Sequence, residues 1–193
     1  MRTKLDPHLI AETNGNANPK QIYQQGNLRV TVLAPELIRV EFDRYGRFLD
    51  KATQAVWFRD LGECAYSVTQ SPPHLIVSTE KMSCYIHTKR KTVNFCEIDG
   101  CRVPADNRDN LKGTYRTLDM ARGAVPLGKG IIGRKGVAVM ADKSLILDSD
   151  GTCKARPREK DLYCFATSDH RRALHLFYQI TGCLLYTSPS PRD

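Results

Sequence analysis

The sequence predicts a mainly β protein, an antiparallel β-sandwich with one C-terminal α-helix. Two observations favour this fold class. Short runs rich in apolar residues, several of them alternating with polar residues, recur about every ten residues between residues 28 and 95, with turn residues between them. Helical periodicity appears convincingly only once, near the end. Apolar residues make up 41% of the 193 residues, which is enough for a real core.

The first strands are the clearest. Leu28–Leu33 alternates apolar and polar residues, and Leu37–Phe42 follows after the turn Ala34-Pro35-Glu36, which together predict a hairpin. A strand is also expected at Ala55–Phe58, around the single tryptophan. Further strands are expected at 65–70, 74–79, 83–88 and 92–95.

Asn110–Gly151 combines a long polar loop with two short apolar runs. The loop is rich in Gly, Thr and Arg, and loops of this length in compact domains are usually functional or disordered. The runs Val137–Met140 and Leu145–Leu147 are expected to pair as a β-hairpin, with Asp148–Gly151 as the next turn.

The helix is expected between a cap at Ser168 or Asp169 and a terminal glycine, Gly182. Along one face, Ala173 and Leu174, Phe177 and Tyr178, and then Thr181 recur at helical spacing. We expect this face to pack only partly on the sandwich.

Three ordered segments carry a family resemblance. They are RVTVLAPELIRVEFDRYGRFLDKATQAVWFR at 29–59, the runs NLKGTYRTLDM, AVPLGKGIIGRKGVAVM and SLILDSDG within 110–151, and DLYCFATSDHRRALHLFYQITG at 161–182. Together they resemble the N-terminal β-sandwich domain of glycoside hydrolase family 31, the α-glucosidase and α-xylosidase family. The resemblance extends from about Gln21 to Gly182.

The resemblance implies a galactose-mutarotase-like sandwich followed by a catalytic (β/α)8 barrel. Retaining glycosidases need two carboxyl groups roughly 5 Å apart, and the family takes both, as aspartates, from its barrel. The family's W-x-D-M-N motif is not in this sequence, and Leu118-Asp119-Met120-Ala121 is the nearest string. The resemblance therefore implies α-linked oligosaccharides or glycosides as ligands of the full-length parent, with no catalytic residue in this chain, no cofactor and no metal.

The same family sends a loop of this domain towards the mouth of the barrel. The matching positions here include Tyr115, Arg116 and Asp119, which we expect to contact substrate. A carboxylate accepts bonds from sugar hydroxyls, and an aromatic ring covers an apolar sugar face. The alternative is that Arg116 and Asp119 only tie the loop together.

The expected organisation has four parts. Residues 1–20 form a frayed lead-in, 21–166 the sandwich domain, and 167–182 a linker helix towards the barrel. Residues 183–193, CLLYTSPSPRD, match the translation of a common transposon-based sequencing adapter, so we interpret them as a tail outside the natural reading frame.

The chain carries a formal net charge of +8, but its basic residues are scattered in short groups such as Lys89–Lys91 and Arg134-Lys135. A nucleic-acid surface would gather them on one element near stacking aromatics. No apolar run approaches the length of a membrane helix, and the N-terminus lacks the apolar core of a secretory signal. We expect a cytoplasmic protein with no nucleic-acid or membrane partner.

The remaining motifs predict structure rather than chemistry. The seven cysteines form no C-x-x-C pair and no zinc-like spacing with histidine, so we interpret them mainly as reduced structural thiols. Gly128–Gly133 matches G-x-G-x-x-G but follows a proline-containing loop, so a flexible turn is favoured over dinucleotide binding.

A free-standing carbohydrate-binding or interaction sandwich is the alternative function. Such a protein would normally expose an aromatic platform, and aromatic residues are only 8% of this chain. The identity of the glycoside and the oligomeric state stay open.

Overall fold

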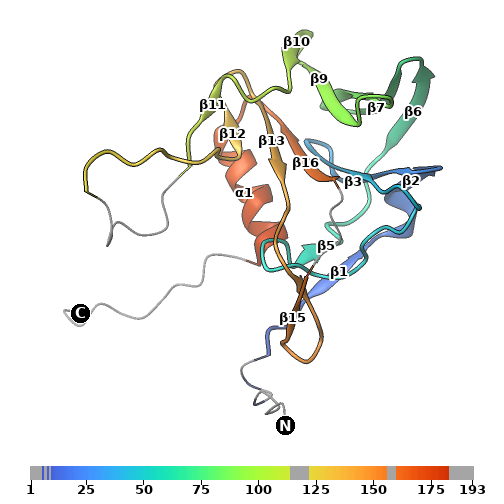
Figure 1. Ribbon diagram of the computed structural model, residues 1–193. Coiled ribbons are helices and arrows are strands. Elements are labelled where there is room, and N and C mark those ends of the chain that lie inside the picture. The colour runs from blue at the N-terminus through green and yellow to red at the C-terminus, as the bar shows by residue number, and fades with distance from the viewer. Residues whose placement is uncertain (1–5, 7, 9, 114–121, 156–159, 183–193) are drawn as a thin grey trace.

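The fold is a three-layer arrangement of two β-sheets and one helix, seen in a computed structural model that describes residues 6, 8, 10–113, 122–155 and 160–182. Two five-stranded antiparallel sheets form the sandwich, and α1 (His170–Thr181) packs on the free face of one of them (Figure 1). We call the sheet that lies between the helix and the other sheet the central sheet, and the other sheet the outer sheet. This architecture confirms the predicted fold class.

The strands follow in spatial order. The outer sheet contains β10 (Cys101–Pro104), β9 (Thr92–Ile98), β8 (Met82–His87), β7 (His74–Thr79) and β6 (Tyr66–Ser71). The central sheet contains β13 (Val137–Ala141), β16 (Lys160–Ala166), β4 (Leu37–Phe42), β3 (Leu28–Ala34) and β2 (Ile22–Gln25). The small pairs are β1 (Asn14–Ala17) with β5 (Phe58–Arg59), β11 (Asn110–Leu111) with β12 (Ile132–Gly133), and β14 (Ile146–Leu147) with β15 (Cys153–Lys154). A 3-10 turn, η2 (Pro19–Gln21), precedes β2.

The main core fills the space between the two sheets. Alternate side chains of each strand point into it, as the two-residue period of a strand requires. Its buried members come from both sheets and include Val30, Val40, Val77, Ile86 and Cys164.

The central sheet is also buried on its other face, and every residue of β3 and β4 is buried. Half of this second face is apolar and packs under α1, which contributes the fully buried Leu176 and Ile180. A helix packed on a sheet buries the residues that recur along one stripe.

The prediction of which residues form the apolar face of α1 is therefore partly wrong. Ala173 is buried and Phe177 packs against the same cluster, but Leu174 is 37% exposed and the main contacts come from Leu176 and Ile180. The predicted ends are confirmed. Asp169 accepts hydrogen bonds from two backbone amides of the first turn, and Gly182 ends the helix with a left-handed φ of 84°.

The other half of this face carries four buried charged side chains. Arg29 makes a two-point contact with Glu41 at 2.7 and 3.1 Å. Arg39 makes another with Asp161 at 2.9 and 2.7 Å, and it also reaches Glu41 at 2.9 Å. The carbonyl oxygen of Leu49 accepts hydrogen bonds from both arginines. We call these five residues the ion network.

The expected hairpin of residues 137–140 with 145–147 is wrong. β13 pairs instead with β16, and β14 pairs with β15 around the turn 148–151. The buried Asp142 explains the difference, because its carboxylate accepts hydrogen bonds from Thr53 at 2.7 Å and from the Ser144 hydroxyl. The segment after β13 is thus held against residues 53–55 and does not turn back.

Two further expectations need correction. The strand expected at Ala55–Phe58 is only the short β5, Phe58–Arg59. The lead-in 1–20 is not frayed throughout, because Asn14–Ala17 pairs with β5 in parallel. A Cβ at Gly15 would lie 2.1 Å from the Ala52 nitrogen, so glycine permits this close approach. Within the described part of the chain, no helix has the length and apolarity to cross a membrane.

We predict that Arg39→Met lowers the free energy of unfolding by about 3–5 kcal/mol, because it removes a buried guanidinium from between two carboxylates. Urea denaturation measures the loss. Arg102→Met is the matched control, since Arg102 pairs with Glu97 on the surface and should cost less than about 1 kcal/mol. Equal losses in the two variants would contradict a stabilising role of the ion network.

Candidate functional site

The three residues expected to contact substrate, Tyr115, Arg116 and Asp119, lie outside the described residues. The structure does describe where their loop leaves and rejoins the domain. We call this part, residues 110–113 and 128–133, the loop base. In Figure 1 it appears as β11 and β12 beside α1, and the segment that leads from residue 122 to the loop base extends away from the sandwich.

The loop base is closed by backbone pairing and by one buried amide. Asn110 pairs with Gly133 in the β11–β12 ladder, and the Gly113 amide donates to the Gly128 carbonyl at 2.8 Å. The Asn110 side chain donates to the Gly130 carbonyl at 2.8 Å and accepts from the Gly130 amide at 2.7 Å. One side chain therefore satisfies both polar groups of Gly130 and closes a twenty-residue span.

A second asparagine attaches this region to the central sheet. Asn107 donates its amide to the Val139 carbonyl and accepts from the Val139 amide, both at 2.9 Å. Asn107 has a left-handed φ of 59°, a conformation that asparagine tolerates better than most residues. Because Val139 belongs to β13, the loop base is fixed to the edge of the sheet.

The glycines of Gly128–Gly133 serve close backbone contact. A Cβ at Gly130 would lie 2.5 Å from the Leu111 oxygen, and one at Gly133 would lie 1.9 Å from the Val137 oxygen. The segment is thus part of a paired ribbon and not the flexible turn that we expected. No helix begins after it, as a dinucleotide site requires, since β13 follows.

The loop base shares a face of the central sheet with α1. Ile131 packs against the cluster that contains Leu176 and Ile180 of the helix. Therefore the start of the long loop and the last helix of the described chain lie on the same side of the domain. The opposite side of the central sheet is occupied by the outer sheet.

The two main basic segments lie apart. Lys160 at the start of β16 donates to the carbonyl oxygen of Lys91, which places Lys89–Lys91 at that end of the strand. Arg134-Lys135 precedes Val137, which pairs with Ala166 at the other end of β16. These segments therefore do not form one continuous phosphate-binding surface.

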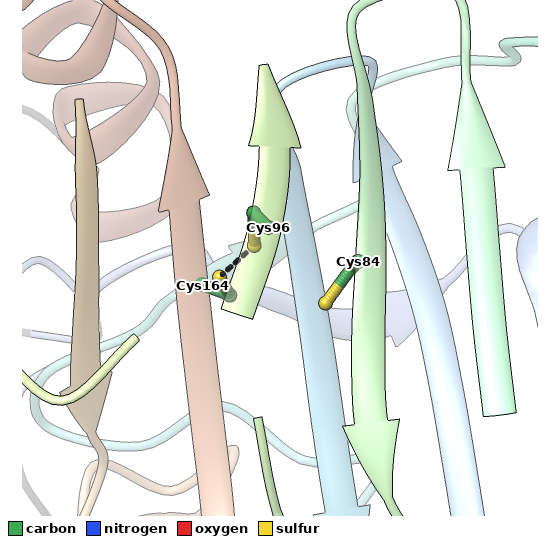
Figure 2. Close-up of side chains that lie close together, drawn as sticks. All are labelled: Cys84, Cys96 and Cys164. Atoms are coloured by element: carbon green, nitrogen blue, oxygen red, sulfur yellow. Dashed lines mark hydrogen bonds between the residues drawn. The ribbon is translucent and has the colours of Figure 1, made fainter. Parts of the chain in front are cut away.

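Three buried cysteines form the densest group of metal-ligating side chains in the described chain. Cys84, Cys96 and Cys164 have sulfur atoms within 4.8 Å of one another in the main core (Figure 2). Hydrogen bonding to the Cys164 sulfur, together with burial, raises the pKa of the Cys84 and Cys96 thiols well above the ordinary value. No local sequence pattern predicts this group, because its members come from three different strands.

The chain matches no protein-family model and no curated protein. Among solved structures it is similar to the GH31 dextranase FjDex31A of Flavobacterium johnsoniae. In the complex with isomaltotriose the identity is 13%, the TM-score is 0.49, and the match covers 89% of this chain and 28% of that chain. In the complex with glucose the identity is 12%, the TM-score 0.47, and the coverage again 89% and 28%.

The class defined by the fold is a two-sheet antiparallel β-sandwich with a helix on its second face. The family of the similar dextranase, GH31, is the one that the sequence segments resemble. The chain spans 28% of the length of that dextranase.

We predict that Gly130→Ala loosens the loop base, because its Cβ meets the Leu111 oxygen at 2.5 Å. Amide hydrogen exchange in residues 110–113 and 128–133 should accelerate, and the stability should fall by about 1–3 kcal/mol. Gly128→Ala is the matched control, since nothing lies within 4 Å of its added Cβ. If the amide hydrogens of both variants exchange as fast as those of the unsubstituted chain, the close contact between residue 130 and the Leu111 oxygen does not require glycine.

Proposed function

We propose that this chain is the N-terminal β-sandwich domain of a retaining α-glycosidase of glycoside hydrolase family 31. In this role it supports the catalytic (β/α)8 barrel and contributes the loop of Tyr115, Arg116 and Asp119 to the substrate pocket. The substrate class that we propose for the full-length parent is α-linked glucosides. The similar dextranase was solved in complex with isomaltotriose and with glucose.

The observation that carries the proposal is the shared face of loop base and helix. α1 lies at the C-terminal end of the described chain, and Ile131 of the loop base packs against the cluster containing its buried residues. A barrel that followed α1 and packed on this side would meet the long loop as well. The two asparagine contacts hold the loop base in place, so that the loop would start from a fixed position.

The segments that resemble the family also occupy the strands of one sandwich. Residues 29–59 supply β3, β4 and β5, and residues 161–182 supply nearly all of β16 and all of α1. The middle segments supply β11 to β14 and the loop base. The segments that carry the resemblance therefore include strands of the central sheet, the loop base and the helix that packs on that sheet.

We assign to this chain a role in binding and orienting the substrate, and no bond-breaking step. Hydrolysis with retention needs a nucleophile and an acid/base, which we assign to the barrel. The loop would bind sugar hydroxyls through Asp119 and Arg116 and cover an apolar sugar face with Tyr115. We further propose a cytoplasmic location, which the six free cysteines of the described residues support, since reducing compartments keep thiols unpaired.

We predict that the chain by itself does not hydrolyse p-nitrophenyl α-glucoside above background. Release of p-nitrophenol from protein purified to homogeneity measures this directly. Sequencing the gene past codon 182 is the companion experiment, with a barrel-coding continuation that contains a W-x-D-M-N motif as the expected result. Persistent turnover by the pure chain, or a natural stop codon close to position 182, would contradict the proposal.

In the longer protein, Asp119→Asn should raise KM for an α-linked oligosaccharide by roughly 10- to 100-fold, the effect of losing a hydrogen bond to a charged group. Asp109→Asn is the matched control, because Asp109 lies before the loop and pairs at 3.4 Å with the exposed Lys135. An unchanged KM in Asp119→Asn would favour the interpretation that Asp119 only ties the loop together.

The alternative, a free-standing carbohydrate-binding sandwich, has one observation in its favour. Tyr85 and Phe95 stack at 4.1 Å on the outer sheet, and the Arg102 guanidinium lies 4.1 Å from the Phe95 centroid. The stacked rings already share a face with each other, which reduces the area open to a sugar. Isothermal titration of the chain with isomaltotriose separates the two functions, since only the free-standing module should bind it without a barrel.

A further inference from the structure

Three cysteines converge in the main core from both sheets. Cys84 on β8 and Cys96 on β9 are direct partners across two neighbouring strands of the outer sheet. Cys164 comes from β16 of the central sheet, and Figure 2 shows its sulfur directed at Cys96. The period of the strands points all three side chains into the interior.

The sulfur positions suit a three-coordinate metal ion. All three lie within 4.8 Å of one another, and Cys96 and Cys164 are 3.5 Å apart. Metal–sulfur bonds of about 2.3 Å in a trigonal plane hold sulfur atoms about 4 Å apart. Small side-chain rotations would therefore bring the three sulfurs to bonding distance without moving the strands.

The surroundings select the kind of ion. The three residues are fully buried, and their cross-strand neighbours include Val77, Ile38 and Val139. Among the described residues, no histidine or carboxylate belongs to this group. Calcium and magnesium require oxygen ligands, and zinc prefers four ligands in a tetrahedron. Three thiolate-type donors in an apolar core suit a soft ion of low coordination number.

We propose that Cys84, Cys96 and Cys164 form a buried three-sulfur site for a soft monovalent metal ion of the Cu(I) class. The site is independent of the proposed glycosidase role and lies in the core, away from the loop base. The bound ion would cross-link β8 and β9 of the outer sheet to β16 of the central sheet.

Binding releases protons, because the thiolate is the ligand. Three thiolates on one Cu(I) mean that three thiol protons leave as the ion binds, and the site then carries a net charge of −2, which the apolar core makes costly. The affinity should therefore rise with pH. Because the unfolded chain does not hold the three sulfurs together, binding should also stabilise the folded state.

The test uses the full chain with Cys101, Cys153 and Cys183 changed to serine, so that these three thiols do not contribute. The reduced protein is loaded anaerobically with Cu(I) from a buffered chelator complex and desalted. Copper per chain, X-ray absorption at the copper edge and the melting temperature are then measured. Cys164→Ala is the test variant, and Cys64→Ala is its matched control, because Cys64 is half-buried and packs against the core outside the three-sulfur group.

We expect one copper per chain with three sulfur ligands and a melting temperature that rises with Cu(I) concentration. Cys164→Ala should lose the copper and Cys64→Ala should keep it. The proposal is overturned if the serine-substituted chain retains no copper, or if Cys164→Ala retains as much as Cys64→Ala. If Cys164→Ala does not fold, the test rests on the number of sulfur ligands that X-ray absorption finds around copper in the serine-substituted chain. Fewer than three sulfur ligands would refute the site.

Discussion

The ion network is the constraint on which the rest of the fold depends. The central sheet is covered on both faces, so the charged side chains on its second face have to be neutralised inside the protein. Glu41 and Asp161 are direct partners across β4 and β16, and the Arg39 guanidinium contacts both carboxylates. Because Arg39 and Asp161 are 122 residues apart, this contact fixes the order of strands from opposite ends of the chain.

The same network places the covering segments. The Leu49 carbonyl accepts hydrogen bonds from Arg29 and Arg39, so the loop after β4 lies over the charged half of the face. The apolar half is left for α1 and for Ile131 of the loop base. The division of one sheet face into a charged half and an apolar half thus decides where the helix and the long loop are attached, and this side is the one that the proposed function uses.

The main core has a different character, because its buried members are apolar, most of them aliphatic, with three thiols and no charged side chain among them. Cysteine there behaves as a small hydrophobic residue that fills space between the sheets. Three thiols at one level of the sandwich add a chemistry that aliphatic side chains lack, since sulfur can bind a soft metal. Packing and metal binding are compatible here, because both place the sulfur atoms close together and away from water.

Local chemistry allowed the sequence to determine several elements. The alternation in Leu28–Leu33 and Leu37–Phe42 predicted β3 and β4, and Asp169 and Gly182 marked the ends of α1, because strand periodicity and helix caps involve residues close in the chain. Tyr115, Arg116 and Asp119 stay predictions that rest on the family resemblance. The tertiary structure decided which strands pair. It joined β13 to β16, clamped Gly130 with Asn110, and brought Cys84, Cys96 and Cys164 together. These contacts depend on register and on layer packing between distant segments, and no local pattern encodes either of them.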